Sequence, residues 1–171
     1  MKNSTTLTIT DDSGFIGIVN TDNFKSFVSE DWELSQLFKH FIDEMNSDNL
    51  ILWSTSSENV WTISFVGKPS DKKSFREFYK TIEVTNKRVF LTNYEDLTMA
   101  AQYEDEKIPA NHNADLYLQL DNGRHEFQVR QLFDPEDYEY DPKGKVNFEI
   151  IVQTDIPKQV QQIDKVFWWT Q

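Results

Sequence analysis

The sequence has no cysteine, so neither a disulfide bond nor a thiolate metal site can stabilise the fold. It has only five glycines in 171 residues, and no Gly-rich loop of the kind that surrounds a phosphate group. The longest apolar stretches, such as Phe148 to Val152, are far too short to span a bilayer. We therefore expect a core held by packing alone, which is feasible because a chain of this length buries roughly 70 % of its unfolded surface on folding.

Signatures of catalysis are missing as well. The three histidines, His40, His112 and His125, share no metal-ligand spacing, and neither His-Glu-x-x-His nor the nucleophile elbow Gly-x-Ser-x-Gly occurs. Carboxylates are so numerous that some pair of them will meet in any fold, so their number does not identify an acid–base pair. The sequence predicts a protein without catalytic residues, metal or cofactor, and an acid–base hydrolase is the least favoured alternative.

Basic residues are scarce relative to acidic ones. There are 17 Lys and Arg against 29 Asp and Glu, which gives a net charge of −12. Fifteen acidic and five basic residues lie between Asn93 and Asp155, so the surplus is concentrated in the second part of the chain. This composition argues against direct binding of nucleic acid, which requires a basic face. It fits either a solubilising surface or a surface matched to a basic protein partner.

The start of the chain has one cation, Lys2, but no apolar run behind it. This pattern differs from a secretory signal, and no segment is apolar enough to enter a membrane. We therefore expect a cytoplasmic protein that does not contact a membrane.

One amphipathic helix is clearly indicated near the N-terminus. Apolar residues recur at three- and four-residue steps from Leu34 to Met45, which places them on one face of a helix. Glu30, Asp31 and Glu33 precede it, where the helix dipole favours acidic side chains.

Elsewhere the apolar residues form short runs or alternate, which is typical of strands. Residues 14–19, 50–53, 60–66, 78–84, 89–91, 116–120, 127–133, 146–152 and 166–169 are predicted strands. Hairpins are expected to join 50–53 to 60–66, and to form at Asn122-Gly123 through a type I′ turn. The predicted fold class is α+β, mostly β: a β-sandwich of antiparallel strands with one amphipathic helix near the N-terminus.

A single compact domain is predicted over residues 1–171. Residues 67–74 combine glycine, proline and charge without periodicity, so they form the best internal boundary. This boundary separates an N-terminal β-α-β-β part from a C-terminal β-sandwich part.

Four tryptophans, Trp53, Trp61, Trp168 and Trp169, leave open a second kind of function. Exposed indole rings could stack on a sugar, so a carbohydrate-binding module is an alternative. Trp168 and Trp169 are adjacent, and neighbours on a strand point to opposite faces, so one of them is expected at the surface.

Two acidic segments are the candidate partner-binding sites. The first interleaves acids with tyrosines between two prolines, a composition that suits recognition of a cationic protein surface. Its candidate residues are Asp134, Glu136, Asp137, Tyr138, Glu139, Tyr140 and Asp141. The second segment contributes Glu104, Asp105 and Glu106. A solvated loop without a partner is the alternative interpretation of the first segment, and an EF-hand is excluded because Glu139 replaces its glycine and Lys145 its final glutamate.

The layout of residues 78–152 resembles the competence protein J family. The shared features are an alternating strand at 79–84, a second strand at 89–91, and a hairpin containing Gly123 that is preceded by leucines and followed by Phe127. Members are small β-sandwich proteins that inhibit a DNA-entry nuclease, and related immunity-type proteins occur in bacterial toxin loci. The resemblance implies a non-enzymatic inhibitor or immunity protein, with a basic nuclease or toxin as its partner.

Overall fold

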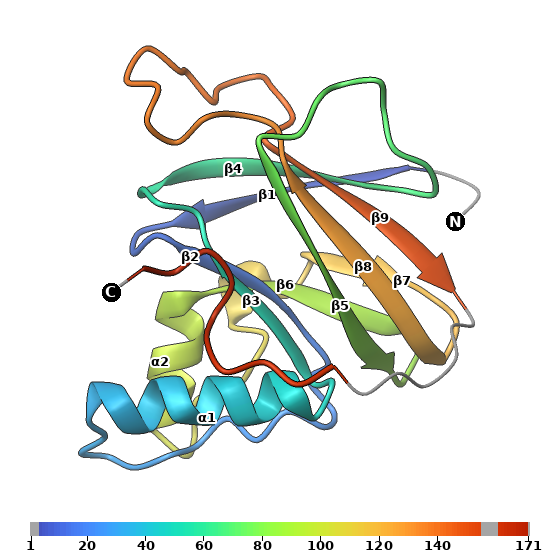
Figure 1. Cartoon of the computed structure of the whole chain (residues 1–171). Coiled ribbons are helices and arrows are strands. Elements are labelled where there is room, and N and C mark those ends of the chain that lie inside the picture. The colour runs from blue at the N-terminus through green and yellow to red at the C-terminus, as the bar shows by residue number, and fades with distance from the viewer. Residues whose placement is uncertain (1–3, 155–160, 171) are drawn as a thin grey trace.

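The computed structural model describes residues 4–154 and 161–170, and they form two β-sheets with helices on one side (Figure 1). The five-stranded sheet has the order β1 (Thr5–Asp11), β4 (Asn59–Val66), β9 (Phe148–Thr154), β8 (Gly123–Gln131), β5 (Arg76–Val84). The four-stranded sheet has the order β3 (Leu50–Ser54), β2 (Phe15–Val19), β6 (Arg88–Asn93), β7 (Tyr117–Gln119). The helices are α1 (Leu34–Asn46) and α2 (Tyr94–Gln102), and a single 3-10 turn, η1, spans Asn111–Asn113. The predicted α+β, mostly β class is confirmed; all strand pairs are antiparallel except β4 with β9.

The main core lies between the two sheets. Trp53 and Ile18 of the four-stranded sheet meet Trp61, Phe127 and Phe148 of the five-stranded sheet, and all are at most 1 % exposed. The outer face of the four-stranded sheet is buried as well, under α1 and α2. Burial on both faces explains why residues 50–53 and 14–19 are continuous apolar runs instead of alternating ones.

The amphipathic helix is confirmed as α1. Leu37, Phe38, Phe41 and Met45 are buried against the sheet, as their spacing predicts. The helix begins with a capping box, in which the Glu33 backbone N–H donates to Gln36 Oε1 at 2.9 Å and the Glu33 side chain accepts from the backbone of residue 36.

The predicted hairpins are wrong, because the strands on either side of these turns belong to different sheets. β3 and β4 do not pair, and neither do β7 and β8. Asn122-Gly123 is therefore a corner between sheets, and only Gly123 of the two has a positive φ, of 129°. The positive φ values of a type I′ turn occur instead at Asn86 (46°) and Lys87 (56°). The two corners are joined, since the Lys87 N–H donates to Asn122 Oδ1 at 2.7 Å.

Two elements were not predicted, and one predicted strand is absent. In β1, Leu7 and Ile9 alternate with threonines, a strand pattern that was overlooked, whereas α2 is a short helix with a weak apolar stripe. Residues 166–169 make only one isolated bridge, from Phe167 to Trp53, and Trp168 has a φ of 60° that a strand does not permit.

Replacing Gly123 by valine is expected to lower the free energy of unfolding by roughly 1 kcal/mol or more, because a β-branched residue is strained at a φ of 129°. No neighbouring atom lies close to a Cβ built there, so the loss would report backbone strain alone. Denaturant titration measures it, with Gln128→Val on the same strand as the control. Equal midpoints for the two variants would contradict the strain.

Each sheet takes strands from both sides of residues 67–74. The expected single unit of residues 1–171, with its internal boundary at 67–74, stays a prediction that limited proteolysis can test.

Candidate protein-binding surface

The segment 134–141, here called the acidic loop, projects between β8 and β9 at the top of the molecule (Figure 1). All five of its carboxylate residues are exposed, and Tyr138 is 102 % exposed, so its ring makes almost no contact with the rest of the chain. Tyr140 is half-buried. Six of the seven predicted residues of this segment are thus presented to solvent, and Tyr140 instead packs against the core.

The acidic loop has a defined conformation because its own side chains bind its backbone. Asp134, Asp137 and Asp141 each accept, through Oδ1, the backbone N–H two residues later, at 2.9–3.0 Å. Tyr140 anchors the loop to the core: its ring stacks on Phe133 with centroids 4.6 Å apart, and its hydroxyl accepts from Asn147 Nδ2 at 2.9 Å. These contacts fix the backbone that carries the acidic side chains, and they leave the Tyr138 ring in solvent.

No carboxylate of the acidic loop forms an ion pair with any residue in 4–154 or 161–170. Arg130, the nearest buried cation along the chain, is bound to Glu149 and lies 3.6 Å from Glu77. The Lys145 ammonium lies 4.8 Å from the centre of the Tyr140 ring. The loop carboxylates therefore hold the loop through hydrogen bonds to its own backbone, and no cation of the described residues neutralises their charge.

The second acidic segment, Glu104 to Glu106, follows α2 and is also exposed. It lies at the lower end of the molecule in Figure 1, whereas the acidic loop lies at the upper end. The structure therefore does not bring the two segments into one surface, and each must be considered separately.

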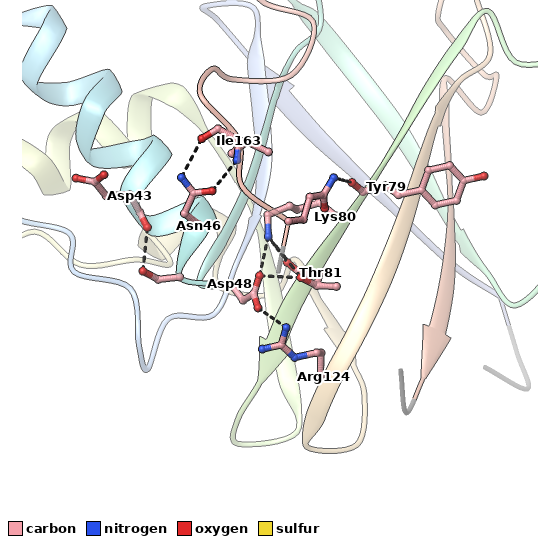
Figure 2. A network of polar contacts seen from close by, with 10 residues as sticks. Asp43, Asn46, Asp48, Tyr79, Lys80, Thr81, Arg124 and Ile163 are labelled. Carbon is pink, nitrogen blue, oxygen red and sulfur yellow. Dashed lines mark hydrogen bonds and ion pairs between the residues drawn. The ribbon is translucent and has the colours of Figure 1, made fainter. Parts of the chain in front are cut away.

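A group of buried charges lies elsewhere, centred on Asp48 (Figure 2). Asp48 Oδ1 accepts from Lys80 Nζ at 2.6 Å and from the Thr81 hydroxyl at 2.7 Å, and its Oδ2 lies 2.8 Å from Arg124 Nη1. Lys80 is only 1 % exposed. Because one carboxylate oxygen of Asp48 binds two groups of β5 and the other pairs with Arg124 of β8, this group ties the turn after α1 to β5 and β8.

Sequence reasoning missed the Asp48 group because its members are distant and individually ordinary. Asp48 lies in a polar turn that ends a helix, and Lys80 occupies one position in an alternating strand. The only local signal is that Lys80 shares the face of Phe78 and Ile82, both buried, where an unpaired lysine would be costly.

The tryptophans do not form an exposed stacking platform. Trp53 and Trp61 are at most 1 % exposed. Trp168 lies under the Arg76 guanidinium at 4.4 Å, and Trp169 stacks on Phe38 with centroids 4.0 Å apart. Burial also lowers the pKa of Arg76 from its ordinary value, although the group stays a cation. The last two indoles therefore fix the C-terminal segment against α1 and β5.

Within residues 4–154 and 161–170, no three His, Asp or Glu side chains are grouped so that they could hold a metal ion. None of the helices in these ranges has the length and apolar character needed to cross a membrane.

Comparison with known proteins shows a likeness of fold. No protein-family model matches the sequence, and no curated protein does either. A solved structure described as Crocagin biosynthetic gene J has a TM-score of 0.53 and 10 % identity, over 88 % of this chain and 96 % of that chain. ComJ from Bacillus subtilis, described as an inhibitor of the DNA degrading activity of NucA, has a TM-score of 0.48 and 12 % identity, over 89 % of this chain and 96 % of that chain. ComJ, of the family that the layout of residues 78–152 resembles, is thus among the solved structures matched, and at these identities the likeness is one of fold alone.

Proposed function

We propose that this chain is a non-enzymatic protein-binding protein of the inhibitor or immunity kind, which docks its acidic loop on a basic nuclease or toxin in the cytoplasm. The observation that carries the proposal is the acidic loop itself: five exposed carboxylates without an ion pair in the described part of the chain, ordered around a fully exposed tyrosine.

The order within the loop matters because binding then costs less conformational entropy. A loop already held by its own aspartates and by Tyr140 does not have to be fixed by the partner. Tyr138 supplies a stiff aromatic contact of the type that dominates binding energy at the centres of interfaces. The surrounding carboxylates would pair with lysines and arginines of the partner.

The charges would act mainly on the rate of association. Opposite charges steer two proteins together and raise the association rate by about 10–10³-fold at low salt. At physiological ionic strength the screening length is about 8 Å, so the same charges then act only at short range. A strong salt dependence of the association rate is therefore expected.

The decisive experiment neutralises the acidic loop without unfolding it. Replacing Asp134, Asp137 and Asp141 by asparagine and Glu136 and Glu139 by glutamine retains every Oδ1 that accepts a loop N–H. The free energy of unfolding should change by no more than roughly 0.5 kcal/mol. Association with the partner, recovered by pull-down from the source cell and measured at two salt concentrations, should slow by about tenfold or more at low salt.

The matched control neutralises Glu104, Asp105 and Glu106 at the other end of the molecule. This control changes charge of the same sign far from the acidic loop, so it separates docking from the effect of net charge. Equal association rates for the parent and the loop variant would refute the proposal. Slowing by both variants in proportion to the charges removed, three in the control and five in the loop variant, would mean that net charge, and not a docking loop, is responsible.

A further inference from the structure

The sandwich has two open sides, where the edge strands of the two sheets lie. The C-terminal segment 161–170 covers one of these sides. On the side of β3 and β5, the Ser54 N–H donates to the Phe167 carbonyl at 2.9 Å, and Phe167 bridges to Trp53. Gln161 Nε2 donates to the Tyr79 carbonyl at 3.0 Å, so the C-terminal segment 161–170 reaches the edge of β5 too. This segment thus occupies the edge groups of both strands.

On the opposite side, the edge of β1 presents backbone groups that have no partner among the described residues. Thr8 is opposite Thr62 of β4, but Thr62 uses its N–H and its carbonyl to bind Asn147 on the other side of β4, at 2.7 and 2.9 Å. In an antiparallel pair, opposite residues either bond to each other or both point away. The backbone N–H and C=O of Thr8, and by alternation those of Thr6 and Thr10, therefore face away from β4.

Only one of these groups has a partner in the part of the chain that the structure describes: the Thr10 carbonyl accepts from Asn93 Nδ2 at 2.9 Å. Between Thr5 and Thr10 there is no charge and no proline, the features by which proteins usually protect an exposed edge from another strand. The stretch Thr6–Thr8 is thus an open edge, able to pair with an added strand.

A pocket of about 660 Å³ lies beside this edge, between β1 and α2. Its acidic wall consists of Asp12, Glu95 and Asp96, and Met99 and Leu116 supply an apolar wall. Among the described residues no lysine or arginine lines it, and Glu95 Oε2 is buried without a hydrogen-bond partner. Asp96 is already bound, because His112 Nε2 lies 3.3 Å from its Oδ1 and Asn113 Nδ2 donates to its Oδ2 at 2.8 Å. Burial, and after it the charge of Glu95, raises the pKa of the neighbouring Tyr94 above its ordinary value.

We propose that the open edge of β1 binds an extended basic segment of a protein partner by strand addition, with a lysine or arginine side chain of that segment in the adjoining pocket. Strand addition to an exposed edge is an established mode of peptide recognition, in which the backbone gives affinity and pockets for alternate side chains give specificity. The aliphatic stem of the side chain would contact Met99 and Leu116, and its cation would satisfy Glu95 and Asp12. This site uses other residues than the acidic loop, so the two proposals can fail separately.

The test uses the isotope-labelled full chain and a short, end-capped peptide of alternating arginine and threonine. Adding the peptide should shift the amide resonances of Thr6 and Thr8 and slow their hydrogen exchange, because these N–H groups acquire a partner. A peptide with glutamate in place of arginine should not bind.

Thr8→Pro, which removes one outward N–H at a position where an edge strand tolerates proline, should weaken binding about tenfold, whereas Thr8→Val should not. Asp12→Asn combined with Glu95→Gln should weaken binding without loss of folding, and it supplies the test if Thr8→Pro does not fold.

Three results would overturn the inference. Shifts confined to the acidic loop would place the basic peptide there, which would support the proposed function and remove the edge site. Equal binding of the glutamate peptide would show that the pocket does not select a cation. Protection of Thr6 and Thr8 in the free protein that grows with protein concentration would mean that a second copy of the chain occupies the edge.

Discussion

Replacing Asp48 by asparagine is expected to destabilise the protein by about 3 kcal/mol, because it leaves the buried Lys80 ammonium without its counter-ion. Asparagine keeps the shape of the side chain and tolerates the positive φ of 58° at this position, so the loss would come from charge rather than from backbone strain. Arg124 loses its carboxylate partner in the same change.

Urea denaturation of the parent and the variant gives the difference in the free energy of unfolding. The matched control is Asp43→Asn, which breaks the exposed pair of Lys39 and Asp43, also 2.6 Å apart, and which should cost less than about 1 kcal/mol. Combining Asp48→Asn with Lys80→Met should recover part of the loss, since no buried cation then lacks a partner. A single variant as stable as the control would show that the Asp48 group does not hold α1 to the sheet.

Replacing Asp11 by alanine is expected to cost about 3 kcal/mol or more, because this buried carboxylate accepts five hydrogen bonds and has no cationic partner in the described part of the chain. Oδ1 accepts the backbone N–H groups of Ser13, Gly14 and Phe15 at 2.8–3.2 Å. Oδ2 accepts from the Thr55 hydroxyl at 2.7 Å and from Trp61 Nε1 at 3.0 Å. The residue thus closes the turn between β1 and β2 and ties it to the core.

Without the carboxylate, the Gly14 N–H and the Trp61 indole N–H stay buried with no acceptor, which is more costly than losing the bonds alone. Thermal unfolding followed by tryptophan fluorescence measures the loss. The neighbouring exposed Asp12 provides the control, because Asp12→Ala should change stability by less than roughly 0.5 kcal/mol. Similar unfolding midpoints for the two alanine variants would contradict the structural role of Asp11.

Elements whose signals are local were predictable. The stripe from Leu34 to Met45 specifies α1 because the same side chains must face the sheet whatever the sheet's topology is. The pairing of strands was not predictable at the corners. Asn122-Gly123 has the composition of a hairpin turn, but the chain changes sheets there, and a turn signal does not say which strand will be the neighbour.

The charged residues also include some whose environment the sequence predicted and some whose environment it did not. Exposure of the acidic loop followed from its composition, since five carboxylates in a stretch of eight residues cannot be packed into a core. The buried charges were not foreseeable: Asp11 and Asp48 look like any other of the many acids, yet both are at most 9 % exposed. Their burial depends on donors from β4, β5 and β8 that come from distant parts of the sequence.

By itself, the sequence determined the mostly β class, the first helix, the acidic surplus and the exposure of the acidic loop, because each depends on composition or on spacing within a few residues. Only the tertiary structure decided which strands share a sheet, that the C-terminal segment closes one side of the two sheets, and that the edge of β1 remains open beside an acidic pocket. These features arise from contacts between residues far apart in the chain, and their cost in chain entropy is repaid only when the whole core packs.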